Sequence, residues 1–291
     1  MELQSRVVEI QRQGLGLAVI SYDPPEILRA FSKQRGITFP LLSDARSATI
    51  KRYGILNPVP EWATGPNGSD PSVQSDVQKY VSVVRPNASM VGIAFPGTFI
   101  LDRQGRVTSR FFEDFYIERN TVSSIMMRLG RGETVSGAKL STSHLEVTTY
   151  PSDSTIAPGN RFSLVLEVKP RSRMHVYAPG VSNYRPIVMK FDTQPFVRFL
   201  SMEYPSSEIY NFKPLGERVP VYQKPFRLIQ EVIVEGTPQA QASFRGKDAL
   251  ALTGTLEYQA CDDAISYNPT SIPLTWTLKF RAIVTERPGR P

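Results

Sequence analysis

The stretch from Gly92 to Val107 constrains the fold of this chain more than any other. It reads Gly-Ile-Ala-Phe-Pro-Gly-Thr-Phe-Ile-Leu-Asp-Arg-Gln-Gly-Arg-Val. Residues 98–101 are β-branched or large and apolar, residues 102–105 supply a turn that ends in glycine, and the chain returns over residues 106–112. The pattern predicts a β-hairpin. Pro96 stands just before its first strand, a position that tolerates proline because the ladder does not need its missing N–H group.

The run from Pro96 to Arg106 resembles the Pro-x-Thr-Phe-(Ile/Leu/Val)-(Ile/Leu)-Asp-x-x-Gly hairpin of the thioredoxin superfamily. The likeness is strongest to the alkyl hydroperoxide reductase/thiol-specific antioxidant branch, which is peroxiredoxin-like. Residues 15–21 are similar to that family's second strand, and Phe31–Asp44 is similar to its helix followed by Phe-Pro-Leu-Leu-Ser-Asp. These matches follow the family's order over residues 1–129. They imply a thioredoxin-like α/β fold with thiol redox or peroxide chemistry.

The same resemblance implies a role for Pro96. A proline at the entrance of this strand is a candidate cis-proline that faces the nucleophile. The cis form of such a bond is less stable than the trans form by only about 0.5–1 kcal/mol. We therefore expect a cis Phe95–Pro96 bond beside the catalytic position.

The composition of the chain limits the number of its domains and the classes of protein to which it can belong. A chain of 291 residues is long enough for two domains, and 41% hydrophobic with 21% charged residues is ordinary for a globular protein. No run of 18 apolar residues is present to form a transmembrane segment. The net charge is +7, but the basic residues are scattered, so no nucleic-acid partner is predicted. The N-terminus lacks signal-peptide chemistry, which leaves the bacterial cytoplasm and the periplasm both open.

Apolar periodicity divides the first half into helices and strands. Residues 1–13 read as a helix that shows no N-cap, so the chain is expected to begin inside an element. Asp23 to Gly36 reads as a capped helix that buries Ile27, Leu28 and Phe31. Further helices are expected over residues 44–54 and 122–129.

The domain boundaries follow from changes in the pattern. A thioredoxin-like domain is expected over residues 1–130, with an insertion at 57–90 rich in Pro, Gly, Ser and Asn. Residues 131–143 read as a linker. Residues 144–284 alternate apolar and polar positions, which predicts an immunoglobulin-like β-sandwich, and 285–291 read as a tail. Strands are expected near residues 162–168, 174–177, 186–192, 197–203, 226–235, 249–259 and 272–283.

Two segments of the second domain resemble the N-terminal immunoglobulin-like domain of the periplasmic disulfide-interchange reductase. They are Met174–Gly180 and Leu256–Ala264, the latter containing Tyr-Gln-Ala-Cys-Asp-Asp. In that family a second cysteine follows about six residues after the first, whereas here Ser266 and Tyr267 stand near that spacing. The resemblance supports the fold and an interaction surface, and the missing partner argues against redox cycling by Cys261.

Thioredoxin-like folds carry their nucleophile at the N-terminus of the first long helix, where the helix dipole stabilises a thiolate. That position would lie before Met1, because residues 1–13 resemble the second half of this helix. The nucleophile-bearing N-terminus is therefore expected to be missing from this chain or lost in its lineage. An upstream cysteine or selenocysteine is one hypothesis, and the 291 residues alone are expected to be inactive.

Cys261 is the one cysteine of the chain, so no intramolecular disulfide can form. It reads either as a small apolar residue of a strand or as a thiol that forms a mixed disulfide with a partner. In the second case Asp262 and Asp263 would raise its pKa and slow it. His144 and His175 are too far apart in sequence to define a metal site, and no cofactor motif is visible.

These observations predict a thiol-dependent redox or antioxidant protein of the peroxiredoxin-like type. Its partner would be a protein thiol or disulfide, or a peroxide substrate. The alternative is a redox-inactive protein-interaction module built from a thioredoxin fold and a β-sandwich. The two hypotheses differ in one point. The enzyme requires a nucleophile encoded before Met1, and the interaction module does not.

Overall fold

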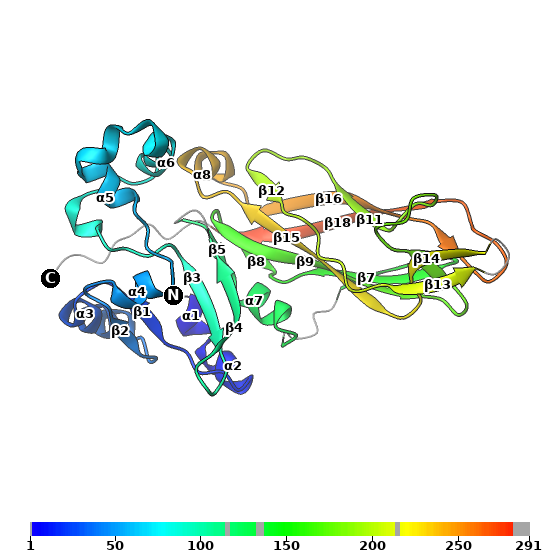
Figure 1. Ribbon diagram of the computed structural model, residues 1–291, viewed down its shortest axis with the longest axis horizontal. Helices are drawn as coiled ribbons and strands as arrows, with labels where there is room; N and C mark the ends of the chain where they lie inside the picture. The colour runs from blue at the N-terminus through cyan, green and yellow to red at the C-terminus, as the bar shows by residue number, and fades with distance from the viewer. Residues whose placement is uncertain (1, 114–116, 132–136, 213–215, 282–291) are drawn as a thin grey trace. The chain divides into compact units, whose positions relative to one another are not determined.

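The computed structural model describes residues 2–113, 117–131, 137–212 and 216–281 (Figure 1). Its contacts divide the chain into two units. The first comprises residues 1–131 with 236–242, and the second comprises residues 132–235 with 243–291. None of the helices in the described ranges is long and apolar enough to cross a membrane.

The first unit mixes short helices with short strands, as an α/β fold requires. Its elements are α1 (Glu2–Ser5), α2 (Val7–Arg12), β1 (Val19–Ser21), α3 (Pro25–Arg35), β2 (Leu41–Ser43), α4 (Ala48–Arg52), α5 (Val59–Thr64), η1 (Pro66–Ser69), α6 (Pro71–Val81), η2 (Ala88–Met90), β3 (Gly97–Leu101), β4 (Val107–Phe112), β5 (Arg119–Asn120) and α7 (Val122–Arg128). Strands β1 and β2 pair in parallel. Strands β3 and β4 form the predicted antiparallel hairpin, and Gly105 takes the expected positive φ of 77°.

The helix predicted from Asp23 forms, with two differences. It begins one residue later than expected, because Pro24 occupies the N-cap position and Pro25 the first turn, with no side-chain cap. Gly36 ends it in the left-handed conformation, as predicted. Only Leu28 is buried, whereas Ile27 and Phe31 remain 50% and 39% exposed. The expected burial of these two side chains is wrong, because the helix packs on a sheet of only two strands.

The insertion at residues 57–90 is folded rather than irregular. Helix α6 begins at Asp70, whose side chain accepts a hydrogen bond from the backbone N–H of Ser72, and Pro71 follows in the first turn. The helices α5 and α6 pack together, and Tyr80 of α6 is buried. The insertion is therefore a small pair of packed helices and not a structureless loop.

The second unit is built from β-strands. Its elements are β6 (Ala138–Ser141), β7 (Leu145–Pro151), β8 (Thr155–Ile156), β9 (Asn160–Pro170), β10 (His175–Tyr177), β11 (Val188–Phe191), β12 (Val197–Phe199), β13 (Glu208–Phe212), β14 (Glu217–Tyr222), β15 (Phe226–Val234), α8 (Pro238–Phe244, which spans the division), β16 (Ala249–Tyr258), β17 (Ala260–Cys261) and β18 (Thr270–Phe280). The expected strands appear, and β6 occupies part of the expected linker. Residues 132–136 of that linker and the expected tail at 285–291 lie outside the described residues.

Three sheets arise from these strands. Their orders are β12-β15-β9-β7-β6, β11-β16-β18-β8 and β13-β14-β10-β17. The first two carry the long ladders, β15 with β9 and β16 with β18. Alternate residues of β16 and β18 are buried, as in the run Leu250, Leu252 and Leu256 of β16. Strands β9 and β15 are instead buried over continuous runs of residues. The β-rich second unit is consistent with the predicted sandwich.

The two large sheets are joined by a buried hydrogen bond. The indole N–H of Trp276 in β18 donates to the Thr149 hydroxyl of β7 over 2.9 Å. That hydroxyl in turn donates to the backbone carbonyl of Val165 over 2.8 Å. Both polar groups are satisfied inside the apolar core, so the contact fixes the relative position of the sheets.

Candidate functional site

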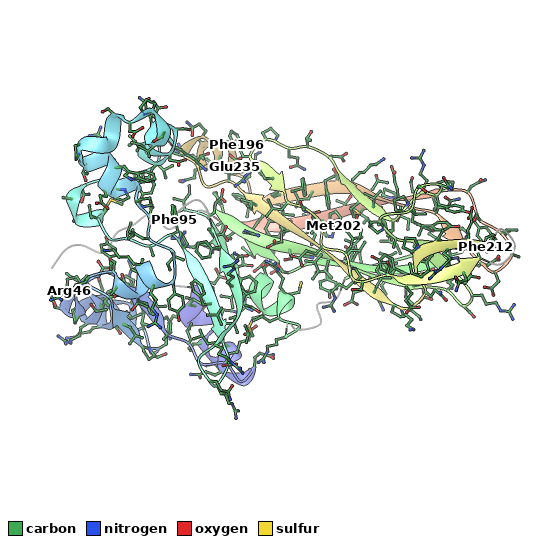
Figure 2. All side chains as sticks on the ribbon, viewed as in Figure 1. Arg46, Phe95, Phe196, Met202, Phe212 and Glu235 are labelled. Atoms are coloured by element: carbon green, nitrogen blue, oxygen red, sulfur yellow. The ribbon has the colours of Figure 1, made fainter. Side chains whose placement is uncertain are left out.

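The loop that leads into β3 is the first candidate site. The N–H of Phe95 donates to the carbonyl of Ile55 over 2.7 Å, and the N–H of Asn57 donates to the carbonyl of Ile93 over 2.9 Å. Leu56 and Ala94 form a β-bridge between these bonds. Figure 2 labels Phe95 in this loop. The segment before Pro96 is thus held by backbone bonds although it lies outside a regular strand.

A second clamp holds the start of the same loop. The hydroxyl of Ser47 donates to the carbonyl of Gly92 over 2.7 Å. Gly92 has a φ of +96°, and a Cβ there would lie 2.6 Å from the Ser47 hydroxyl oxygen. Only glycine fits this position, on both conformational and steric grounds. The geometry around residues 92–96 is therefore specified by several independent contacts.

Pro96 does not have the expected bond geometry. No peptide bond in the described residues is cis, so the Phe95–Pro96 bond is trans and our expectation of a cis bond is wrong. The trans form is the intrinsically favoured one, and the loop makes its hydrogen bonds without the cis form. The carbonyl of Pro96 accepts the N–H of Glu113 over 3.2 Å, and Glu113 is itself buried. Whether Pro96 faces a nucleophile stays a prediction.

The first unit holds no thiol, because Cys261 is the one cysteine of the sequence. Cys261 lies in β17, at the edge of the sheet β13-β14-β10-β17, and is 1% exposed. Its thiol donates to the backbone carbonyl of Asp262 over 3.1 Å, and the Ser266 hydroxyl donates to its sulfur over 3.4 Å. The second candidate site is thus a buried thiol with two polar neighbours.

Tyrosines surround this thiol. Tyr177, Val219 and Val221 form the buried cluster with Cys261, and Tyr184 and Tyr210 pack against it. The Tyr177 and Tyr184 rings are stacked with centroids 4.2 Å apart. The Tyr177 hydroxyl also lies 2.9 Å from that of Ser266. Burial raises the pKa of Tyr177, so it stays neutral at physiological pH.

The two outer tyrosines are tied to carboxylates. The hydroxyl of Tyr184 donates to Glu217, and that of Tyr210 donates to Asp263, each over 2.5 Å. The hydrogen bond to Asp263 and partial burial raise the pKa of Tyr210 to about 12. These bonds hold both rings in place beside Cys261. Strand β13, which carries Tyr210 and ends at Phe212, lies at one end of the second unit (Figures 1 and 2).

The turn after Cys261 is organised by Asp262. Its carboxylate accepts the N–H groups of Ala264 and Ile265 and the hydroxyl of Tyr267. The backbone N–H of Ile265, the Tyr267 hydroxyl and the N–H of Ala264 lower the pKa of Asp262 to about 2. Tyr267 thus helps to hold this turn in place. It stands near the spacing at which the family that residues 256–264 resemble has its second cysteine.

His175 is the residue of this site that sequence reasoning missed. It faces Cys261 across the antiparallel pair of β10 and β17. His175 is 2% exposed, and its Nε2 atom has no hydrogen-bond partner among the described residues. The sequence contained one indication that His175 and Cys261 lie close together: segments 174–180 and 256–264 resemble the same domain of one family. His144, by contrast, packs its ring on Tyr267 with centroids 4.6 Å apart.

The two histidines therefore lie in different surroundings, as their separation in sequence suggested. Among the described residues, no group of three or more His, Cys, Asp or Glu side chains is arranged to hold a metal ion. The second site thus combines a buried thiol, a buried imidazole, several tyrosine and serine hydroxyls and a turn organised by the carboxylate of Asp262.

Comparison with known proteins agrees with the fold of the first unit. Residues 1–110 match the AhpC/TSA family. Together with the α/β architecture, this match shows that the N-terminal part of the chain is a thioredoxin-like domain similar to the AhpC/TSA family. The resemblance predicted from the hairpin is confirmed. A search of curated proteins found no match.

Two solved structures are similar to part of this chain. The N-terminal periplasmic domain of ScsB from Proteus mirabilis aligns with 15% identity and a TM-score of 0.33, over 49% of this chain and 49% of that chain. The SrpA adhesin from Streptococcus sanguinis aligns with 17% identity and a TM-score of 0.24, over 49% of this chain and 59% of that chain. The chain thus spans about half the length of these proteins. Because both TM-scores are well below 0.5, we infer neither fold nor function from these two structures.

Proposed function

We propose that this chain belongs to a thiol-dependent redox or antioxidant protein of the peroxiredoxin-like type. The observation that carries the proposal is the AhpC/TSA match over residues 1–110, a family whose membership implies thioredoxin-superfamily redox function. The substrate would be a peroxide or a protein disulfide, and a thiol would be the reductant.

The nucleophile would be supplied by residues that precede Met1, as a cysteine or a selenocysteine. The first unit has no cysteine of its own, so a nucleophilic thiol would have to be supplied to it. The sheets support it as well. Within the described residues, β1 pairs only with β2 and β3 only with β4, so both β1 and β3 offer an edge to a further strand. A strand inserted there would join the two small sheets into one.

The fixed loop at residues 92–96 would then form one wall of the active site. Its position is set by Ser47, Ile55 and Asn57, so it needs no rearrangement to receive a nucleophile. Preorganisation of this kind lowers the cost of reaching the transition state. Pro96 is the residue of this wall that we place beside the nucleophile.

The alternative is a redox-inactive interaction module. The upstream gene sequence separates the two hypotheses first, because an in-frame cysteine or selenocysteine codon shortly before the first helix favours the enzyme. The decisive experiment expresses the extended chain with Cys261→Ser and measures peroxide-dependent oxidation of a dithiol reductant. We expect turnover that is lost when the upstream nucleophile is replaced by serine. Equal, background-level rates for both proteins would favour the interaction module.

A further inference from the structure

A cluster of buried groups in the second unit contains a histidine with an unsatisfied ring nitrogen. His175 of β10 is 2% exposed, and its Nε2 atom has no hydrogen-bond partner among the described residues. Its ring packs against that of Tyr210 in β13, with centroids 4.3 Å apart and planes inclined by 41°. A neutral imidazole tolerates this contact. An imidazolium in the same place would be a buried charge with an N–H group that nothing accepts, which is far less stable.

Tyr210 holds an edge strand against this cluster. Within the described residues, β13 is the outer strand of the sheet β13-β14-β10-β17 and pairs with β14 alone. The ring of Tyr210 packs against the cluster that contains Cys261, and its hydroxyl donates to the carboxylate of Asp263 over 2.5 Å. A short edge strand opens at a lower free energy than the inner strands of a sheet, because fewer contacts hold it. The contacts of Tyr210 therefore help to decide whether Cys261 stays covered.

Two carboxylates next to the cluster favour a charged imidazole, whereas burial opposes it. Burial lowers the pKa of His175, and the charges of Asp263 and Asp262 act in the opposite direction. The Asp262 carboxylate already accepts two backbone N–H groups and the hydroxyl of Tyr267. Asp263 accepts the neutral hydroxyl of Tyr210. Because a cation is a stronger donor than a neutral hydroxyl, a charged His175 would compete with Tyr210 for Asp263.

We propose that His175 is an acid-sensitive switch that controls access to Cys261. While His175 is neutral, its ring packs on Tyr210, and β13 stays closed over the thiol. When His175 gains a proton, the imidazolium moves out of the apolar contact toward the carboxylates and displaces Tyr210. Strand β13 then loosens, and the thiol becomes accessible to solvent and to reagents. The switch would make Cys261 inert in a neutral compartment and available in an acidic one.

His175 is the member of this cluster suited to respond to mild acid. The ionisable groups that face it are Tyr177 of its own strand, Tyr210 of β13, Cys261 of β17 and the carboxylates of Asp262 and Asp263. Burial raises the pKa of Tyr177, and the hydrogen bond to Asp263 raises the pKa of Tyr210 to about 12. Both tyrosines therefore stay neutral in acid. Histidine is the side chain whose ordinary pKa, 6.5, lies in the mildly acidic range.

The direction of the effect follows from the lowered pKa. In the closed form the pKa of His175 lies below 6.5, and in an open, hydrated form it returns toward that ordinary value. The closed form is therefore fully stable above this pH and loses stability as the pH falls below it. The equilibrium shifts toward the open form by up to about tenfold per pH unit, until the closed form is itself protonated.

Cys261 reports the opening, because it is the one thiol of the sequence. The test labels the native 291-residue chain with 4,4′-dithiodipyridine, which still reacts with thiols in acid, between about pH 7.5 and about pH 5. Dividing the rate for the chain unfolded in denaturant by the native rate at each pH gives the protection of Cys261. This ratio removes the intrinsic pH dependence of the thiol. We expect the protection to fall at least about tenfold over this range.

His175→Gln removes the titrating group and keeps a polar side chain of similar length, and His144→Gln is the matched control. The ring of His144 packs on Tyr267, with centroids 4.6 Å apart, and not on Tyr210. In His175→Gln the protection of Cys261 should change by less than about twofold over the same pH range, and the control should keep the full change. His175→Phe is a second variant that cannot titrate, and it retains an aromatic ring against Tyr210.

Hydrogen exchange locates the opening in the chain. After correction for intrinsic rates, the amides of residues 208–212 in β13 should exchange faster in mild acid, and those of β16 and β18 should not. Two results would overturn the proposal. One is a protection of Cys261 that does not change with pH, and the other is an equal change in the variants that lack His175. The switch does not rest on the proposed redox function, whose nucleophile lies outside this cluster, so either proposal can fail while the other stands.

Discussion

The first unit leaves large apolar side chains in water, and the second unit buries its own. Among the described residues, the twelve largest fully buried side chains all lie between Leu145 and Leu278. Of the thirteen exposed large hydrophobic side chains in the same part of the chain, eleven lie between Leu3 and Val107. The strands of the two units also differ in the length over which they pair. Strands β16 and β18 pair over ten residues, but β1 and β2 pair over three.

This difference teaches where stability resides. A two-stranded sheet is marginal alone, because it buries little apolar surface per ordered residue. The second unit has long strand ladders and many fully buried apolar side chains. The first unit has two separate small sheets within the described residues. We therefore expect the two units to respond differently to heat, substitution and acid.

The largest expected effect is thermal. A domain is stable by about 5–15 kcal/mol, and a unit whose strands bury little apolar surface has only a small share of that stabilisation. We expect calorimetry of the 291-residue chain to show two transitions, or aggregation through the first unit. If a further strand pairs with β1 and β3, as proposed above, supplying that strand should raise the lower transition. A single cooperative transition that the added strand leaves unchanged would contradict this and favour the interaction module.

A core substitution should sharpen the same contrast. Leu252 of β16 is fully buried, so Leu252→Ala should destabilise the second unit by about 2–5 kcal/mol. Leu42 of β2 is 47% exposed, and Leu42→Ala should change stability by no more than about 0.5 kcal/mol. Denaturant unfolding of both variants measures the difference. Equal losses would show that the first unit has a core comparable to that of the second.

A smaller loss of stability is expected when the hydrogen bond between the two large sheets is removed. Thr149→Val keeps the shape of the side chain but leaves the Trp276 indole N–H without its acceptor. The loss should be about 1–3 kcal/mol in the higher transition. Thr253→Val, which removes a surface hydrogen bond to Asp192, is the control and should cost under about 0.5 kcal/mol. If both variants unfold alike, the Thr149 bond does not join the sheets energetically.

The smallest effect is a pH dependence in the second unit. The pKa of Asp262 is lowered from 3.8 to about 2 by its hydrogen bonds in the folded state. A lowered folded pKa means that this stabilisation is present above the unfolded pKa and is lost as the pH falls through about 2. Asp262→Asn should therefore lower the melting temperature at neutral pH, and the difference from the unchanged protein should shrink between pH 4 and 2.

Asp263→Asn is the neighbouring control for this measurement. It removes a carboxylate that accepts the Tyr210 hydroxyl but does not organise the turn. We expect its melting curve to follow that of the unchanged protein over the acid range. A difference for Asp262→Asn that stays constant down to pH 2 would show that the carboxylate charge is not the source of the stabilisation.

Local patterns in the sequence predicted much of this structure. The hairpin over β3 and β4 and the helix stop at Gly36 are local, since a turn glycine and alternating apolar residues determine them. The same rules would have found α6, because Asp70 caps this helix and Pro71 follows in its first turn. At α3 the similar Asp23-Pro24 pair does not act in this way, since Pro24 occupies the N-cap. The strand β6 was missed because its short run sits in a segment rich in Gly, Ser and Thr.

The candidate sites were only half predictable. The sequence singled out Pro96 and Cys261, one by its place before a strand and the other as the one thiol. It did not reveal the trans bond at Pro96, which depends on how the loop is held by Ile55, Asn57 and Ser47. It also did not reveal His175, because pairing between strands more than 80 residues apart is set by register.

The sequence by itself determined the element types, the thioredoxin-like character of the first half and the β-rich character of the second. These follow from neighbouring residues, through turn chemistry, helix caps and the period of the apolar positions. Only the tertiary structure decided which side chains are buried and which meet. Ile27 and Phe31 stay exposed because the sheet beneath them is narrow. His175 stands opposite Cys261 because β10 pairs with β17. Burial and strand register depend on contacts between distant segments, which no local pattern encodes.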